Sequence, residues 1–191
     1  TYVHDYLGLS RNCRLFEVKQ ACYAGTAALQ MANSVILSNA SPGAKALVIA
    51  TDVGNFAPES GMLYMEPSEG TGAVAMLISA KPDIMTIDMG ASGYYSYEVM
   101  DTCRPVYEKT LGDAYLSLDS YISCLKNSFK AYKEKIEDFD FYNTFDYFAF
   151  HSPFGGLVKG AHRHLMHMLD IRDIKAINVD FKKRLMPSLS Y

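Results

Sequence analysis

Cys22 stands where a folded chain could use a thiol for covalent chemistry. It lies between a short apolar run, 15–18, and a helical pattern that starts at Ala24. The first turn of a helix has unpaired backbone N–H groups, which together with the helix dipole favour a negative atom. The thiolate is the reactive form of cysteine, so this position favours a nucleophile whose thioester oxyanion the same N–H groups could bind. An ordinary buried cysteine fits the pattern equally well.

His151 is the second candidate for chemistry. It ends an apolar run, 147–150, and is followed by Ser152 and Pro153. Pro153 restricts Ser152 to extended geometry and delays the next helix, which fixes the imidazole at the end of a strand. Such a histidine can accept and return a proton or polarise a carbonyl. A single histidine is more often structural, but a reactive Cys22 at the same sheet edge favours catalysis.

Three charged side chains are candidates for supporting roles. Asp52 follows the apolar run 46–51, and it either orients the site or caps the next turn. Lys159 and Arg163 are one turn apart on the helix predicted after His151. They either clamp the phosphates of a pantetheine arm or coenzyme A, or they form a solvated basic face.

The sequence gives little support for a metal site. Of three histidines on the last predicted helix only two share a face, and no carboxylate stands one turn away to complete a ligand set. The cysteines are too far apart for a zinc site or a disulfide framework, so we expect neither. The histidines are His162, His164 and His167, of which the last two share a face, and the remaining cysteines are Cys13, Cys103 and Cys124.

The elements that position these side chains alternate between strand and helix. Helices are predicted at 24–35, 116–136 and 155–169, and a helix end with a glycine stop is predicted at Gly8. Strands are predicted at 15–18, 46–50, 73–78, 84–89 and 147–150. Continuous apolar runs are typical of parallel strands covered on both faces, and ligands bind at the carboxyl ends of such strands. Cys22 and His151 occupy the turns of two strand-turn-helix units.

The composition is that of an ordinary globular α/β domain. The chain has 191 residues, of which 49% are hydrophobic and 20% charged, and a formal net charge of −3. This charge gives no general reason to bind nucleic acid, because phosphate neutralisation needs a basic surface. No apolar run approaches the roughly 20 residues that a membrane span needs, and the N-terminus does not resemble a signal peptide. We expect a cytoplasmic protein that binds neither nucleic acid nor membranes.

Several segments resemble those of 3-hydroxy-3-methylglutaryl-CoA synthases. Residues 16–28 resemble the family's nucleophile segment and residues 150–154 its histidine segment. Residues 50–52 and 66–75 lie between them in the family's order and approximate spacing. Two further segments, 98–105 and 154–163, resemble the branch of the family that installs β-branches in bacterial polyketides with substrates carried on acyl carrier proteins.

The resemblance implies a thiolase-like fold, a layered α/β/α architecture of which this chain is an incomplete part. Full members of the family are about twice as long as this chain. We therefore expect one incomplete domain, in which about 1–92 close the N-terminal half and about 93–191 open the C-terminal half. By analogy with the fold we also expect a homodimer.

The resemblance also assigns roles to individual residues. Cys22 matches the residue that takes the acetyl group as a thioester, and His151 the residue that engages the β-ketone and helps protonate the new alkoxide. Asp52 matches an active-site acidic residue and Ser68 a position that lines the acyl pocket. Lys159 and Arg163 become phosphate contacts of phosphopantetheine or coenzyme A by analogy only. The glutamate that deprotonates the acetyl methyl group belongs to an upstream segment with no match here, and Glu17 does not fit its motif.

The implied activity is condensation of a Cys-bound acetyl group with the β-ketone of a polyketide intermediate on an acyl carrier protein. It needs no permanently bound cofactor, because a phosphopantetheine thioester carries the substrate. One alternative is the primary-metabolic synthase that uses acetyl-CoA and acetoacetyl-CoA. A second alternative is a catalytically silent protein that docks carrier proteins. The chain alone is not expected to complete the whole reaction, because the general base is missing from it.

Overall fold

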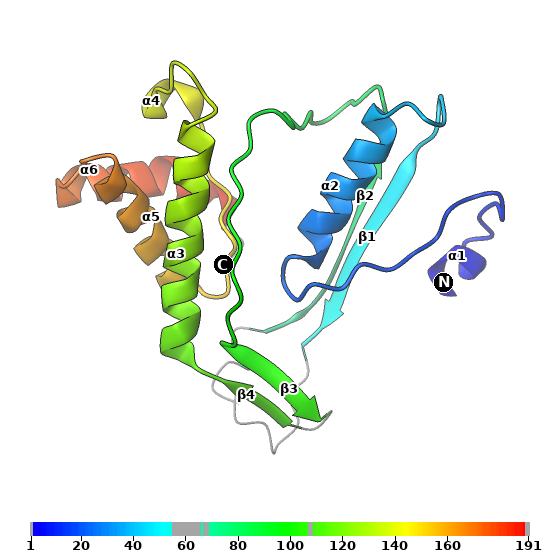
Figure 1. The fold of residues 1–191 in the computed structure, drawn as a ribbon, viewed down its shortest axis with the longest axis horizontal. Helices are drawn as coiled ribbons and strands as arrows, with labels where there is room; N and C mark the ends of the chain where they lie inside the picture. The colour runs from blue at the N-terminus through cyan, green and yellow to red at the C-terminus, as the bar shows by residue number, and fades with distance from the viewer. Residues whose placement is uncertain (1, 55–65, 67–68, 107–108, 190–191) are drawn as a thin grey trace. The chain divides into compact units, whose positions relative to one another are not determined.

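A computed structural model describes residues 2–54, 66, 69–106 and 109–189. The chain divides into two compact units (Figure 1). Unit 1 comprises Thr1–Val53 and Thr71–Ile87, and unit 2 comprises Gly54–Gly70 and Asp88–Tyr191. Within the described ranges no helix is both long enough and apolar enough to cross a membrane.

Unit 1 is a helix packed along a two-stranded sheet. It contains α1 (Tyr2–Tyr6), α2 (Ala24–Leu37), β1 (Ala46–Val53) and β2 (Thr71–Ile78). The strands are antiparallel and pair from Ala46 with Ile78 to Val53 with Thr71. The predicted glycine stop after the first helix is confirmed: Gly8 has φ +59° and its N–H donates to the Asp5 carbonyl at 3.0 Å.

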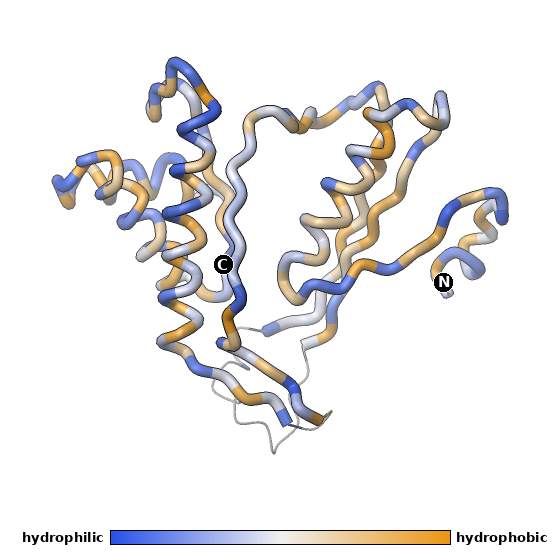
Figure 2. Tube along the Cα trace, viewed as in Figure 1, coloured by the Kyte–Doolittle hydropathy of each residue, from blue (hydrophilic) through white to orange (hydrophobic). Residues whose placement is uncertain are grey.

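The prediction of parallel strands is wrong for the pair formed by β1 and β2. β1 and β2 run antiparallel, and apolar colour follows β1 and much of α2 in Figure 2. Much of this apolar surface is exposed within the unit, because the described residues supply a helix on the sheet and no second covering layer. A continuous apolar run reports neither strand direction nor the partner that covers it. The exposed residues include Leu47, Ile49, Val74 and Leu77.

Two further strands predicted at 15–18 and 84–89 do not form. Residues 15–18 are extended without a partner strand among the described residues, and Phe16 is exposed. Ile84 is 100% exposed. At the end of the second stretch Asp88 Oδ1 accepts from the N–H groups of Gly90 and Ala91, at 3.0 and 3.3 Å, which makes a turn.

Unit 2 is mainly helical. A hairpin of β3 (Thr102–Val106) and β4 (Lys109–Gly112) leads into α3 (Ala114–Lys133), followed by α4 (Phe141–Thr144) and α5 (Gly155–Met168). The chain continues through α6 (Ile174–Asp180), a π-helix η2 (Phe181–Leu185) and a 3-10 turn η3 (Met186–Ser188). The helices at 116–136 and 155–169 are thus confirmed, as is 24–35 in unit 1. The hairpin, α4, α6 and η2 were not predicted from the sequence.

The core of unit 2 is aromatic and aliphatic. Residues of α3 face α5, and apolar and polar residues alternate along α3 in Figure 2 with the helical turn. Met166 and Leu185 are completely buried at its centre. The buried members of this core are Phe141, Phe148, Val158, Leu165, Met166, Ile177 and Leu185.

The strand predicted at 147–150 is also wrong. This segment is extended, but no strand pairs with it among the described residues. The Phe148 N–H in this segment donates to the Arg184 carbonyl at 2.8 Å. Among the described residues, the apolar run coincides with burial of Phe148 in the core of unit 2.

Gly93 marks a close approach between the chain before β3 and α3. A Cβ at this position would overlap the Ser128 carbonyl oxygen and lie 2.5 Å from the Tyr132 main-chain nitrogen. We expect Gly93→Ala to lower the free energy of unfolding by about 1–3 kcal/mol, because neither backbone atom can move away without displacing α3. The measurement is urea unfolding of the purified protein.

The matched control is Gly160→Ala on α5, where nothing lies within 4 Å of an added Cβ. There the substitution is expected to stabilise by up to about 1 kcal/mol, because alanine favours the helix. Equal stability of the Gly93→Ala protein and the unmodified protein would contradict this packing.

Candidate active site

Cys22 lies in a tight turn immediately before α2. The Tyr23 N–H donates to the Gln20 carbonyl at 2.9 Å, and the Ala24 N–H donates to the Ala21 carbonyl at 3.2 Å. Cys22 is exposed among the described residues, and its role as a nucleophile stays a prediction. The thiol is accessible to a thioester carried on a flexible arm.

The residue before Cys22 has an unusual backbone conformation. Ala21 has φ +42°, in the left-handed region that glycine favours. For an alanine this conformation costs roughly 1–2 kcal/mol, and strained residues of this kind cluster at active sites. The observation supports a functional turn at Cys22.

The two helices that follow Cys22 and His151 begin differently from the others in the described part of the chain. At α3, α4 and α6 an aspartate side chain accepts from first-turn N–H groups. At α2 and α5 the N-cap residues are Tyr23 and Phe154, and neither side chain caps the helix. At neither helix does the N-cap side chain occupy the first-turn N–H groups, which could donate to substrate oxygens. The capping residues are Asp113, Asp140 and Asp173.

The first turn of α2 packs near the carboxyl end of β1. A Cβ on Gly25 would lie 3.2 Å from the Ala50 Cβ, and Gly25 is three residues after Cys22 while Ala50 is two before Asp52. Unit 1 thus brings the two neighbouring segments together. Asp52 is exposed and lies within β1, which runs through to Val53, so the strand does not stop before it as predicted. Its Oδ1 accepts from the Val53 N–H at 2.8 Å, which is a local contact.

His151 is an exposed residue of unit 2 whose backbone is held by α3. The Tyr121 hydroxyl donates to the His151 carbonyl at 2.7 Å, and the two ring centroids are 6.0 Å apart. Desolvation by the surrounding residues lowers the pKa of His151 below its ordinary value of 6.5 and raises the pKa of Tyr121 to about 12. A neutral imidazole at physiological pH can both donate a hydrogen bond and accept a proton.

The remaining candidates are placed as follows. Lys159 and Arg163 are exposed on α5. Ser68 lies outside the described residues. Cys22 belongs to unit 1 and His151 belongs to unit 2. That these two side chains meet in one site stays a prediction.

A buried polar cluster of His162, Asp180 and Arg184 escaped the sequence reasoning, which considered His162 only as a metal ligand. His162 Nε2 lies 2.7 Å from Asp180 Oδ2, and Arg184 Nε donates to Asp180 Oδ1 at 2.7 Å. All three residues are buried. One signal was available: His162 lies between the apolar positions Val158 and Leu165 of α5, on its buried face.

The protonation of His162 follows from its neighbours. A carboxylate paired with Arg184 can only accept, so His162 Nε2 carries the proton. Nδ1 is buried and has no hydrogen-bond partner among the described residues. Burial, together with the nearby Arg184 charge, lowers the pKa of His162 below 6.5 although Asp180 opposes this shift. His162 is therefore neutral in the folded protein at pH 7.

This shift predicts acid lability. The unfolded chain binds a proton at His162 near pH 6.5 and the folded protein does not, so the free energy of unfolding falls as pH drops below about 6.5. For one group the slope reaches at most about 1.4 kcal/mol per pH unit. We expect His162→Gln to flatten this slope in urea unfolding series from about pH 7.5 to about pH 5.5. His164→Gln, on the less buried side of α5, is the control and should leave the slope in place.

The described residues contain no group of three or more histidine, cysteine, aspartate or glutamate side chains that could hold a metal ion.

Two family models match the chain. The model described as hydroxymethylglutaryl-coenzyme A synthase N terminal matches residues 10–83, and the model described as hydroxymethylglutaryl-coenzyme A synthase C terminal matches residues 85–187.

Curated relatives are similar over most or all of the chain. It is 52% identical over 198 residues to the polyketide biosynthesis 3-hydroxy-3-methylglutaryl-ACP synthase PksG of Bacillus subtilis (strain 168), covering 100% of this chain and 47% of that protein. It is 32% identical over 160 residues to the hydroxymethylglutaryl-CoA synthase of Enterococcus faecalis, covering 83% of this chain and 40% of that protein. The chain thus spans about half the length of the curated relatives it matches or somewhat less.

Solved structures agree with the sequence relatives. The HMG synthase of the curacin biosynthetic pathway, in complex with holo donor-ACP, superposes with a TM-score of 0.94 at 55% identity, covering 100% of this chain and 46% of that one. PksG from Bacillus subtilis superposes with a TM-score of 0.91 at 53% identity and the same two coverages.

Proposed function

Since the chain belongs to the hydroxymethylglutaryl-coenzyme A synthase family and has part of its thiolase-like fold, we propose that the protein carrying it condenses an acetyl group with a polyketide β-ketone. The acetyl group is bound to Cys22, and the ketone is carried by an acyl carrier protein. The observation that carries this proposal is the 52% identity over the whole chain to a polyketide HMG-ACP synthase, against 32% to a hydroxymethylglutaryl-CoA synthase.

The first step is acetyl transfer. The Cys22 thiolate attacks the carbonyl carbon of the acetyl thioester and forms a tetrahedral oxyanion. First-turn N–H groups of α2, which the Tyr23 side chain does not cap, donate to that oxygen. The intermediate collapses by breaking the bond to the phosphopantetheine sulfur, which leaves as a thiol after taking a proton. Cys22 then holds the acetyl group as a thioester.

The second step makes and uses a carbon nucleophile. In the family a glutamate outside the matched segments takes a proton from the acetyl methyl group, and the resulting enolate attacks the β-ketone carbon of the acceptor. A negative charge then develops on the ketone oxygen. His151, neutral because desolvation lowers its pKa, donates a hydrogen bond to this oxygen, and the proton that the glutamate took from the methyl group returns through the imidazole to make the hydroxyl group. Water then hydrolyses the Cys22 thioester and frees the thiol.

The supporting residues complete the proposal. Asp52, near the end of β1, is assigned to the active-site carboxylate and Ser68 to the acyl pocket. Exposed Lys159 and Arg163 on α5 contact the phosphate of the phosphopantetheine arm. The partners are acyl carrier proteins, the protein acts as a homodimer in the cytoplasm, and no cofactor is permanently bound. Within the thiolase-like domain, residues to about 92 belong to the N-terminal half.

The test compares donors in the whole protein. Incubation with acetyl-loaded carrier protein should add about 42 mass units, an acetyl for a hydrogen, to the peptide that contains Cys22. Turnover on this donor should exceed turnover on acetyl-CoA at equal concentration. Preference for acetyl-CoA and acetoacetyl-CoA would instead assign the primary-metabolic synthase. Absence of any adduct on Cys22 would leave only a docking role.

A further inference from the structure

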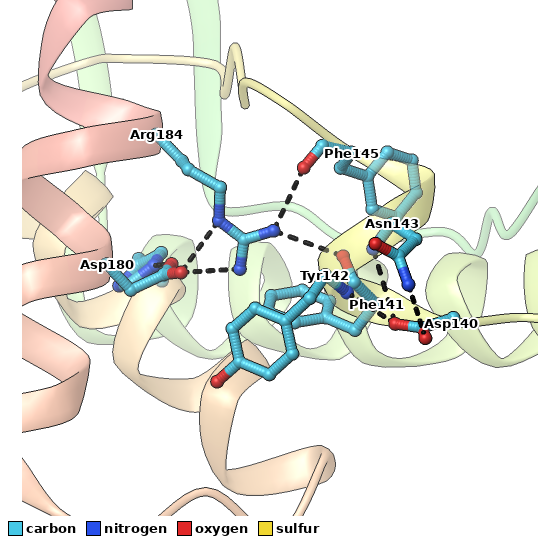
Figure 3. A network of polar contacts seen from close by, with 8 residues as sticks. Asp140, Phe141, Tyr142, Asn143, Phe145, Asp180 and Arg184 are labelled. Atoms are coloured by element: carbon cyan, nitrogen blue, oxygen red, sulfur yellow. Dashed lines mark hydrogen bonds and ion pairs between the residues drawn. The ribbon is translucent and has the colours of Figure 1, made fainter.

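The His162, Asp180 and Arg184 cluster also holds the segment that leads to His151. Arg184 Nη1 donates to the carbonyls of Phe141 and Phe145, at 3.1 and 3.0 Å. Its own carbonyl accepts from the Phe148 N–H at 2.8 Å. Figure 3 shows the guanidinium between the Asp180 carboxylate on one side and these two carbonyls on the other.

Among the described residues, no strand pairs with this segment. After α4 the chain is extended and enters no sheet until α5 begins at Gly155. Phe148, whose N–H reaches Arg184, is three residues before His151. The Arg184 guanidinium also stacks against two rings of the segment, with its carbon 4.1 Å from the Phe141 centroid and 4.9 Å from the Phe148 centroid. The position of His151 therefore depends on that of Arg184.

Arg184 is in turn fixed by its partners. Asp180 is one helical turn earlier and accepts from Arg184 Nε, while His162 of α5 donates to the other carboxylate oxygen. A buried ion pair seldom stabilises a fold more than apolar residues of the same volume would. Its contribution here is to select one conformation of the Arg184 side chain. The π-helical turn Phe181–Leu185 carries Arg184, and such turns occur often at functional sites.

We infer that Arg184, held by Asp180 and His162, is a positioning residue that sets the place of the His151 imidazole through the main chain of residues 141–148. The inference rests on the proposed function for the role of His151. A second contact also fixes this residue, because the hydroxyl of Tyr121 on α3 donates a hydrogen bond to the His151 carbonyl.

The experiment uses Arg184→Lys in the whole protein. Lysine keeps the charge beside Asp180, but a single ammonium cannot reproduce the planar fork that donates to the carboxylate and to two carbonyls. The kcat of condensation should fall by about 10- to 100-fold while the acceptor KM changes by less than about threefold, because a misplaced group costs rate more than binding. Acetylation of Cys22 should stay within about twofold of the unmodified rate. Lys183→Met, an exposed change in the same π-helical turn, is the matched control.

A spectroscopic readout separates positioning from stability. In histidine-labelled protein the NMR signals of His151 should shift in Arg184→Lys, and its pKa should rise toward that of a solvated imidazole. A merely structural role would lower the melting temperature and leave these signals unchanged. His162→Leu, which removes the donor to Asp180, should act in the same direction, and His162→Gln, which keeps a donor, should restore the His151 signals.

The outcomes are distinct. Folded Arg184→Lys or His162→Leu proteins with unchanged kcat and unchanged His151 signals would overturn the inference. If the Arg184→Lys protein does not fold, the inference is tested by the kcat and the His151 signals of the His162→Leu and His162→Gln proteins. Absence of condensation in the unmodified protein would remove the proposed function, and the His151 signals would still decide whether Arg184 positions this residue.

Discussion

The Cys22→Ala protein is expected to take up no acetyl group from a loaded carrier protein and to lose condensation by a factor of at least about 10⁴. Without the sulfur no thioester can form, and the two-step route has no substitute within the turn at 20–24. The exposed position of Cys22 and the uncapped first turn of α2 supply access and oxyanion donors, but neither supplies a nucleophile. The measurement is intact-protein mass spectrometry followed by assay of the condensed product.

Cys13→Ala is the matched control for this prediction. Cys13 is the other exposed cysteine of unit 1, and its sulfur lies 3.3 Å from His4 Nε2, so it tests whether an exposed thiol beside an imidazole is enough for acetylation. The control protein should be acetylated and active like the unmodified one. An acetyl group found on Cys13, or an adduct that survives in Cys22→Ala, would refute the assignment of the nucleophile.

The helices of this protein could be predicted because their signals are local. α2 and α3 repeat apolar residues at intervals of three and four, and the start of α3 has the aspartate Asp113, which accepts from the N–H groups of Tyr115 and Leu116. The stop at Gly8 needs only one residue that tolerates a positive φ. Each of these features is complete within a few positions of the sequence.

The strands could not be predicted as well, because a strand is defined by a partner elsewhere. Segments 15–18, 84–89 and 147–150 have strand-like composition and no partner among the described residues. The third is extended because Phe148 bonds to Arg184, which is 36 positions later by the numbering and gives no local signal. β3 was missed for the opposite reason, since Pro105 argues against a strand and a two-stranded hairpin tolerates it.

The candidate site likewise has features that local sequence predicts and features that only the tertiary structure reveals. The turn at Cys22 and the uncapped helix after His151 follow from residues close in sequence, and both could be anticipated. The cluster around Asp180 joins α5, α6 and η2, so only the tertiary structure reveals that His162 has a carboxylate partner. From the sequence, the one role weighed for His162 was that of a metal ligand, which found little support, because the sequence shows neighbours along the chain and not those across the core.

The His151→Gln protein is expected to form acetyl-Cys22 at close to the unmodified rate and to condense about 10³ times more slowly. Glutamine places an amide N–H near the position of Nε2 but cannot deliver and regain a proton, so the alkoxide loses its proton donor. The proposed first step does not use His151, because it needs only the Cys22 thiolate and donors for the tetrahedral oxyanion. The acetyl enzyme should therefore accumulate, which quenched-flow mass spectrometry detects.

His164→Gln serves as the control, since it removes a histidine from α5 that has no role in the proposed chemistry. Its acetylation and condensation rates should match those of the unmodified protein. Equal slowing of both steps in His151→Gln would show instead that the imidazole activates the Cys22 thiol. Unchanged condensation would show that another group protonates the alkoxide, and the pairing of Cys22 with His151 would then be wrong.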